Sequence, residues 1–326
     1  MAFNRTGGPD VFEWMELETP RPGPGEVLVQ VVCAGVNPAD WKNREGMLEV
    51  FRPYVFPCII GFDAAGVVAA VGEGVNDLEP GERVVTPTNH GQGGQGSYAE
   101  FAVASRDRVA RIPDGLDFAA AAVLPVAALT AWQGLFDRGG LQAADRVFIH
   151  GGSGGVGGFA VQFARWAGAR VAASCGRSNC DYVRSLGVEL VLDYATDDIA
   201  ARLSEWSPDG VDYLMDAVGV SSLPQALSLV KQGGTLVSIP TLVDDGDPAA
   251  AIAAAEQRSV RRVFSTMNDQ ECAEALERIA ALVAAGDIRL PRVIEHPLAE
   301  VAAVHSLVEQ GRGGVKHVLR VSDLGP

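Results

Sequence analysis

The chain has 326 residues, of which 48% are hydrophobic, and its formal net charge is −15 at pH 7. A chain of this length exceeds the usual size of one hydrophobic core, so we expect two domains. The acidic balance and the lack of a basic cluster argue against nucleic acid and anionic membranes as partners. The sequence has five scattered cysteines and no hydrophobic export segment, so we expect free thiols and a cytoplasmic location.

The first hundred residues predict a β-rich domain. Apolar runs separated by glycine-rich turns are typical of a compact antiparallel or barrel-like fold, and they occur at 27–33, 64–71, 83–86 and 98–104. The uncharged stretch 118–136 approaches the length of a membrane span. Because it is rich in alanine and contains Pro125, we expect a buried helix there instead.

Strands and helices alternate from about residue 121 to 265. Strands are expected at 147–150, 170–174, 189–193, 211–216, 234–239 and 260–264. Helices are expected at 155–168, 179–187, 197–205 and 221–231. The alternation predicts an α/β fold with a doubly wound parallel sheet, whose ligand lies beyond the carboxyl ends of the strands. A further helix is expected at 271–285 and a closing strand at 318–321.

The strongest motif follows the strand expected at 147–150. It is a glycine cluster that reads Gly152-Ser153-Gly154-Gly155-Val156-Gly157. Glycines in such a turn allow close approach of the backbone, and the following helix directs N–H groups and partial positive charge at phosphates. The cluster therefore predicts a pyrophosphate site for a dinucleotide. The alternative is a glycine-rich turn with a purely structural role.

The residues that follow the next strand indicate which dinucleotide binds. NAD sites usually carry Asp or Glu about 20 residues beyond the glycines, where the carboxylate accepts from the ribose 2′-hydroxyl. The stretch 172–179 contains no acidic residue. Its donors Ser174, Arg177 and Asn179 suit a 2′-phosphate, so we expect NADPH. Alternatively, Arg177 is a solvated cation and Asn179 caps the next helix.

Motifs of a known family occur along the whole chain. They are PRPGPGEVLVQVVCAGVNPADWKNREG (20–46), GFDAAGVVAAVGEGV (61–75), GERVV (81–85), GSYAEF (96–101), LTAWQGLF (129–136), SLGVELVLDY (185–194), DAVG (216–219) and EQGRGGVKHVLRV (309–321). Together with the glycine cluster, they resemble the zinc-independent quinone oxidoreductases of the medium-chain dehydrogenase/reductase superfamily, relatives of zeta-crystallin.

The resemblance implies a fold and an activity. The fold is a GroES-like β-barrel-type substrate domain at 1–120, completed by about 266–326, with a Rossmann NADP-binding domain at 121–265. The activity is NADPH-dependent hydride transfer to a small molecule, either a quinone or an α,β-unsaturated carbonyl compound. Such acceptors delocalise the incoming charge onto their own oxygen, so the transfer needs no metal. A homodimer is also expected.

The resemblance further implies that no zinc is bound. In zinc-dependent alcohol dehydrogenases of the superfamily, a cysteine and a histidine hold the catalytic zinc. The corresponding residues here are Asn37 and Phe62, which cannot replace these ligands. The four-cysteine lobe for a structural zinc would fall between Thr86 and Tyr98, where the sequence has no cysteine.

Single residues also take roles from the resemblance. Asn37 is expected to bond the substrate oxygen or the cofactor, or else to cap the helix after it. Thr130 is expected to contact the nicotinamide carboxamide, or else to be a buried helix residue. Tyr54 would donate a hydrogen bond to a substrate carbonyl, whereas Asp40 and Asp63 would be structural. Further cofactor contacts are expected at Tyr194, Val218, Gly219, Pro240, Phe264 and Lys316, the last with a surface lysine as its alternative.

Two other functions fit the same motifs. An enoyl-thioester reductase acting on a coenzyme A ester would need cations at the mouth of its cleft, and Lys42, Arg44 and Arg52 are candidates. A non-catalytic cofactor-binding protein, like the relatives recruited as lens crystallins, would bind NADPH without turnover.

Overall fold

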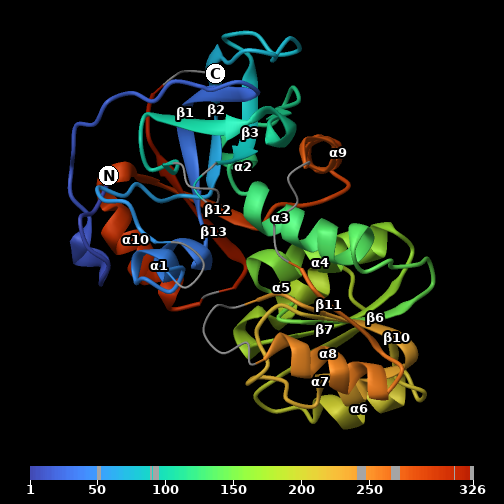
Figure 1. Cartoon of the computed structure of the whole chain (residues 1–326). Coiled ribbons are helices and arrows are strands. Elements are labelled where there is room, and N and C mark those ends of the chain that lie inside the picture. The colour runs from blue at the N-terminus through green and yellow to red at the C-terminus, as the bar shows by residue number, and fades with distance from the viewer. Residues whose placement is uncertain are drawn as a thin grey trace. The chain divides into compact units, whose positions relative to one another are not determined.

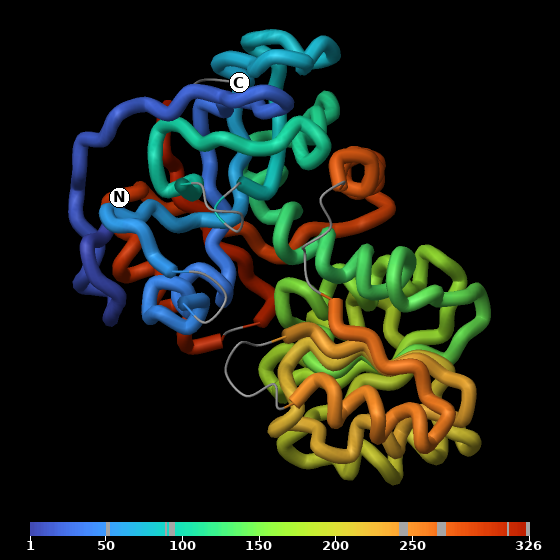
Figure 2. Tube along the Cα trace, viewed as in Figure 1, coloured from blue at the N-terminus to red at the C-terminus, as the bar shows by residue number. Residues whose placement is uncertain are grey.

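The computed structural model describes residues 1–49, 53–88, 90, 95–240, 247–265, 272–311 and 313–323. The chain forms two compact units (Figures 1 and 2), which are Met1–Leu129 with Asp269–Pro326, and Thr130–Asn268. The division between the units falls inside the helix α3 (Pro125–Trp132).

A seven-stranded sheet forms the centre of the first unit. Its strands are β1 (Glu26–Val36), β2 (Asp63–Val71), β3 (Arg83–Pro87), β4 (Phe101–Ser105), β5 (Ala110–Arg111), β12 (Arg292–Pro297) and β13 (Val315–Arg320). Their order is β12-β13-β1-β2-β3-β5, and β4 also pairs with β1. The expected closing strand therefore begins earlier than predicted, and it lies beside β1, far from it in sequence.

The helices of the first unit are α1 (Pro38–Arg44), α2 (Phe118–Ala121), α9 (Ala273–Ala284) and α10 (Val301–Glu309). The single helix expected at 118–136 is wrong in detail, since α2 ends before Pro125 and α3 runs into a π-helical turn, Gln133–Asp137. Proline explains the break, because it lacks the N–H that would continue the helix. No helix in the described part of the chain is long and apolar enough to cross a membrane.

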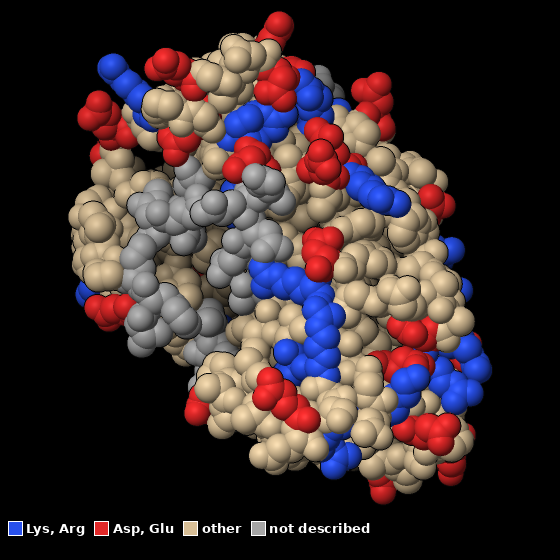
Figure 3. Space-filling view, turned by 45° about the vertical axis from the view of Figure 1, so that its right-hand side comes forward, with Lys and Arg blue, Asp and Glu red and all other residues tan. Residues whose placement is uncertain are grey.

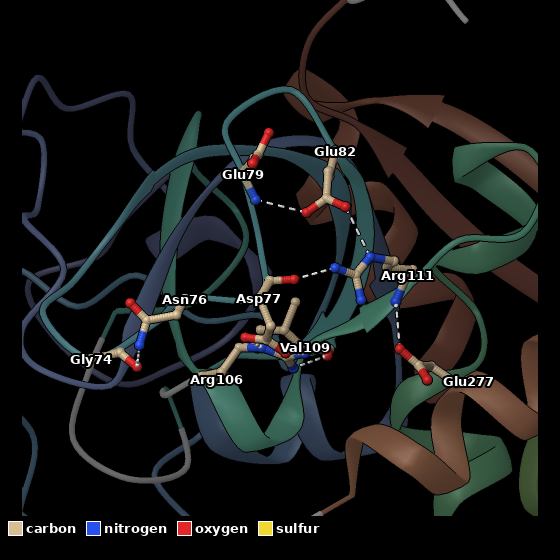
Figure 4. Close-up of polar contacts among 9 residues, drawn as sticks. All are labelled: Gly74, Asn76, Asp77, Glu79, Glu82, Arg106, Val109, Arg111 and Glu277. Carbon is tan, nitrogen blue, oxygen red and sulfur yellow. Dashed lines mark hydrogen bonds and ion pairs between the residues drawn. The ribbon is translucent and has the colours of Figure 1, made fainter.

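A network of polar contacts joins a loop, β5 and α9 within the first unit (Figure 4). Arg106 Nε donates to Asp77 Oδ1 at 2.9 Å, and Arg111 Nε donates to Glu82 Oε1 at 2.9 Å. The backbone N–H of Arg111 donates to Glu277 Oε1 at 3.4 Å, which joins α9 to β5. The network therefore ties a loop and a helix from distant parts of the sequence to the same sheet. Basic and acidic side chains both occur on the face drawn in Figure 3.

The second unit confirms the predicted doubly wound sheet. Its parallel strands are β6 (Arg146–His150), β7 (Arg170–Cys175), β8 (Leu190–Asp193), β9 (Val211–Asp216), β10 (Val230–Ser238) and β11 (Arg261–Phe264), in the order β11-β10-β9-β6-β7-β8. Its helices are α4 (Gly155–Trp166), α5 (Cys180–Ser185), α6 (Ile199–Trp206), α7 (Ala226–Leu229) and α8 (Pro248–Gln257). Figure 1 shows α4 and α5 on one face of the sheet and α6, α7 and α8 on the other.

The helix expected at 221–231 is wrong for most of its length. Only the four residues of α7 are helical, and β10 already begins at Val230. Val230 pairs with Val211 of β9, so strand pairing overrides the local helix preference. The strand order reverses between β6 and β9, and ligands of such sheets bind beside that reversal, beyond the carboxyl ends of the strands.

Candidate cofactor and substrate sites

The glycine cluster forms the turn between β6 and α4. Gly151, directly after β6, has φ +84°, a conformation that favours glycine. The backbone N–H of Gly154 donates to the carbonyl of Gly151 at 2.9 Å, and Gly154 is the N-cap residue of α4. The first N–H groups of this helix therefore lie at the strand reversal, where they can bind phosphate.

Gly154 and Gly157 are glycines for different structural reasons. A Cβ atom at Gly157 would overlap the carbonyl oxygen of Gly151, so the turn itself excludes a side chain there. A Cβ atom at Gly154 would contact one described atom, Gly151 O, at 3.3 Å. Gly154 has φ −72°, so a positive φ does not explain its identity. A ligand that approaches the backbone would explain it.

Polar and exposed residues follow the neighbouring strands. Arg177 is exposed after β7, and its guanidinium makes no hydrogen bond or ion pair with residues that the structure describes. Asn179 takes the N-cap position of α5, but its side chain makes no cap hydrogen bond. Tyr194 is 60% exposed, and its hydroxyl lies 3.1 Å from the point where a Cβ atom would lie if Gly176 carried a side chain. Arg177, Asn179 and Tyr194 therefore follow β7 and β8 at the same edge of the sheet.

Ser174 is buried at the end of β7. Its side chain is 0% exposed. Its Oγ accepts from the backbone N–H of Gly151 at 3.2 Å. Ser174 therefore holds the glycine turn against the end of β7.

Asp216, which the sequence interpretation missed as a site residue, shapes the loop after β9. Its Oδ1 accepts from the backbone N–H groups of Val218 and Gly219, at 3.0 Å each. Val218 is 44% exposed, whereas Gly219 is buried. Pro240 and Phe264, after β10 and at the end of β11, are half-buried. The second unit thus brings the expected cofactor residues to the carboxyl edge of its sheet.

The first unit contains a buried polar cluster around Asn37. Asn37 Nδ2 donates to Asp63 Oδ2 at 2.8 Å, and its Oδ1 accepts from Lys316 Nζ at 2.5 Å. The amide orientation is therefore fixed, because an ammonium only donates and a carboxylate only accepts. Asn37 is also the N-cap residue of α1, where its backbone N–H donates to Asp40 Oδ2 at 2.7 Å. Lys316 is 5% exposed, so the surface alternative for it is wrong.

The ionisable groups of this cluster have perturbed pKa values. Burial and the neighbouring carboxylate of Asp63 raise the pKa of Asp40 to about 7. Burial raises the pKa of Asp63 to about 6, although the Lys316 ammonium opposes this. Burial also lowers the pKa of Lys316, although the carboxylates of Asp63 and Asp40 act to raise it. Asp40 and Asp63 each accept hydrogen bonds from two backbone or amide N–H groups, so they fit the expected structural role.

The sequence also proposed Tyr54, Thr130 and Arg44 as site residues. Tyr54 is half-buried, and its hydroxyl donates to Asn43 Oδ1 at 2.7 Å. Thr130 is 5% exposed on α3. Arg44 is not a surface cation at a cleft mouth, because its side chain is 0% exposed and pairs with Glu309 at 2.8 Å. Arg52 lies outside the described residues.

Comparison with known proteins identifies the family. The family model described as "Alcohol dehydrogenase GroES-like domain" matches residues 23–114, and the one described as "Zinc-binding dehydrogenase" matches residues 155–281. The solved quinone oxidoreductase from Coxiella burnetii has a TM-score of 0.87 at 29% identity and covers 98% of both chains. The chain belongs to the quinone oxidoreductase family of the medium-chain dehydrogenase/reductase superfamily. The GroES-like and Rossmann folds predicted for this family are confirmed.

Curated relatives match over part of their length. A chloroplast envelope quinone oxidoreductase homolog of Arabidopsis thaliana is 41% identical over 65% of this chain and 64% of its own. The NADPH-dependent alkenal/one oxidoreductase of the same plant's chloroplast is 34% identical over 73% of this chain and 61% of its own. The matches therefore span less than two thirds of these relatives.

Proposed function

We propose that the protein uses NADPH to reduce a quinone or an α,β-unsaturated carbonyl compound, and that it does so without zinc. The observation that carries the proposal is the turn at Gly154. It is exposed and leads into the N-terminus of α4, and a Cβ atom at Gly154 would approach one described atom, Gly151 O, at 3.3 Å. Two relatives named as a quinone oxidoreductase homolog and an alkenal/one oxidoreductase support the choice of substrate class.

The second unit would hold NADPH through its loops. The N-terminus of α4 would bind the pyrophosphate, and Arg177, with Asn179 and Tyr194 nearby, would bind the 2′-phosphate. Bound NADPH would supply a hydride to the acceptor. The remaining contacts that we propose for the cofactor in this unit are at Gly152, Ser153, Gly155, Val156, Gly157, Val218, Gly219, Pro240 and Phe264. Lys316, also proposed as a cofactor contact, belongs to the first unit, where its ammonium bonds to Asn37 Oδ1.

Zinc does not fit the residues at the corresponding position. Both polar atoms of the Asn37 side chain are engaged, and the ammonium of Lys316 bonds to its oxygen. A divalent cation there would therefore meet a positive charge. Phe62 offers no donor atom, and the described residues include no group of three His, Cys, Asp or Glu able to hold a metal.

Buried polar residues would contribute to the substrate site. We propose that Asn37, in the first unit, bonds the substrate oxygen or the cofactor, and that Thr130, in the second unit, contacts the nicotinamide carboxamide; both are nearly fully buried. Tyr54 is half-buried, and we propose that its hydroxyl bonds the substrate carbonyl in exchange for Asn43. A Tyr54→Phe variant should then raise the Michaelis constant for the acceptor more than that for NADPH.

A panel of acceptors tests the proposal. NADPH oxidation would be followed with phenanthrenequinone, other quinones, enones and enoyl thioesters, and repeated with NADH. Turnover of quinones or enones with NADPH is expected. Turnover of enoyl thioesters alone would indicate an enoyl-thioester reductase, and NADPH binding without turnover would indicate a non-catalytic protein. We also propose a homodimer, which analytical ultracentrifugation would test.

A further inference from the structure

A buried histidine lies behind the glycine turn of the second unit. His150 is the last residue of β6 and is 2% exposed. Its Nδ1 lies 2.6 Å from Ser174 Oγ, and its Nε2 lies 2.9 Å from Ser222 Oγ. The imidazole therefore bridges the end of β7 and the loop that follows β9.

The direction of each hydrogen bond follows from the groups at the two ends. Ser222 Oγ donates to the carbonyl of Gly219 at 2.8 Å, so it must accept from an N–H at His150 Nε2. Ser174 Oγ accepts from the backbone N–H of Gly151, so its own proton can go to His150 Nδ1. The chain of bonds runs in one direction and requires neutral imidazole with its hydrogen on Nε2.

The series of hydrogen bonds through His150 begins and ends in turns at the proposed dinucleotide site. Gly151 begins the glycine turn, and its carbonyl accepts from the N–H of Gly154. Gly219 lies in the loop after β9, and its backbone N–H donates a hydrogen bond to Asp216 Oδ1. These loops follow β6 and β9, the strands between which the order reverses. His150 thus connects the loops on both sides of the reversal.

We propose that neutral His150 is a positioning residue for NADPH, which sets the glycine turn and the loop after β9 in the geometry that binds the dinucleotide. The inference rests on the proposed function. Protonation would add a hydrogen at Nδ1, facing the Ser174 hydroxyl, which would then lose its acceptor. The carboxylate that acts on His150 is Asp216, its partner in the β6–β9 register. Burial lowers the pKa of His150, and Asp216 opposes this shift.

Two variants test the two hydrogen bonds of His150 separately. In His150→Asn, the amide oxygen can replace Nδ1 as the acceptor for Ser174, and the bond to Ser222 is lost. In His150→Gln, the amide N–H can replace Nε2 as the donor to Ser222, and the acceptor for Ser174 is lost. Each should raise the Kd for NADPH about tenfold at pH 8, as 1.4 kcal/mol would, while kcat at saturating NADPH stays near the wild-type value.

The pH profile of binding distinguishes positioning from general support of the fold. The wild-type Kd for NADPH, from calorimetric titration between about pH 8 and the lowest pH at which the protein stays folded, should rise more steeply than that of either variant below pH 6.5, because burial places the protonation of His150 below that value. The variants retain the part of the profile that comes from the 2′-phosphate, which takes up a proton near pH 6. His305→Asn, a change at a buried histidine of the first unit, is the matched control and should keep the wild-type profile.

The outcomes separate this inference from the proposed function. A wild-type protein that binds no NADPH would refute the proposed function itself. Normal NADPH binding with unchanged Kd and pH profile in both His150 variants would overturn the positioning role. If the variants do not fold, the wild-type Kd for NADH decides, because NADH lacks the 2′-phosphate. An NADH affinity that does not weaken below pH 6.5, down to the lowest pH at which the protein stays folded, would also overturn the inference.

Discussion

Gly154 and Gly157 belong to the same turn, but only Gly157 is required by the protein's own packing. The carbonyl of Gly151 occupies the space of a side chain at Gly157, whereas Gly154 is exposed. The sequence motif alone cannot separate these roles, because both positions show the same letter. The difference depends on which way each Cα–H bond points.

Matched alanine variants test this difference. Gly157→Ala should lower the Tm of the cofactor-free protein, since overpacking of this kind costs about 1–3 kcal/mol. Gly154→Ala should leave that Tm nearly unchanged and weaken NADPH binding by about tenfold or more. Melting curves and calorimetric titration measure the two effects. Normal NADPH affinity in Gly154→Ala would contradict the phosphate-binding role of the turn.

Arg177 is the residue on which the cofactor preference depends. Replacing it with Ala should raise the Michaelis constant for NADPH by about ten- to a hundredfold, because a charge-assisted bond to phosphate contributes about 1.5–3 kcal/mol. The constant for NADH should change little. Steady-state kinetics with both cofactors give the comparison, and equal effects would assign Arg177 to another role.

At the scale of elements, sequence periodicity predicted the second unit well. Each β6-to-β11 strand was placed within a few residues, because apolar runs alternate with amphipathic helices there. The errors arose where tertiary contacts overrule local preference, as at Val230. His150 and Asp216 were missed for a related reason. A polar residue at a strand end shows no pattern, and its partners are known only once the strands are paired.

The packing of α1 against α10 depends on a buried ionic contact. Arg44 of α1 bonds to His305 Nδ1 at 3.3 Å and to Glu309 Oε1 at 2.8 Å, both on α10. Burial and the Arg44 charge lower the pKa of His305 from 6.5 to about 3. His305 is therefore neutral in the folded protein over a range where it would be protonated in the unfolded chain.

This contact predicts loss of stability in acid. Because the folded pKa is the lower one, the contribution is complete above pH 6.5 and falls as the pH decreases towards about 3. The loss should reach about 3 kcal/mol by pH 4. The raised pKa values of Asp40 and Asp63 have the opposite effect, because they increase stability as the pH falls. The quantity to measure is therefore the difference between the unfolding free energies of His305→Asn and wild type, from urea unfolding at each pH. Parallel pH profiles for the two proteins would contradict the prediction.

At the scale of the whole molecule, the family and its two folds follow from motifs spread along the chain. The chemistry of single positions follows less directly. Lys316 was expected either to bind phosphate or to lie at the surface, and it lies inside the first unit beside Asn37. Its burial depends on the pairing of β13 with β1, which joins residues from distant parts of the sequence.

The ammonium of Lys316 and the amide of Asn37 lie where zinc-dependent relatives bind metal, so we predict that the intact protein binds no zinc. Purified protein should contain no stoichiometric zinc, and its activity should be unchanged in a chelator. Atomic emission spectroscopy and turnover with a chelator provide the measurement. One zinc per chain, required for turnover, would show that the residues around Asn37 rearrange to bind metal.

The pairing of β13 with β1 also has a consequence for synthesis on the ribosome. Translation releases β1 early, but the strand that pairs with its residues Cys33 to Val36 emerges only after the entire second unit. The nascent chain therefore carries an unpaired strand edge while the nucleotide-binding unit is already able to fold. Chaperones that shield strand edges should bind ribosome-stalled chains that end before β13 and should release them once Arg320 has left the exit tunnel.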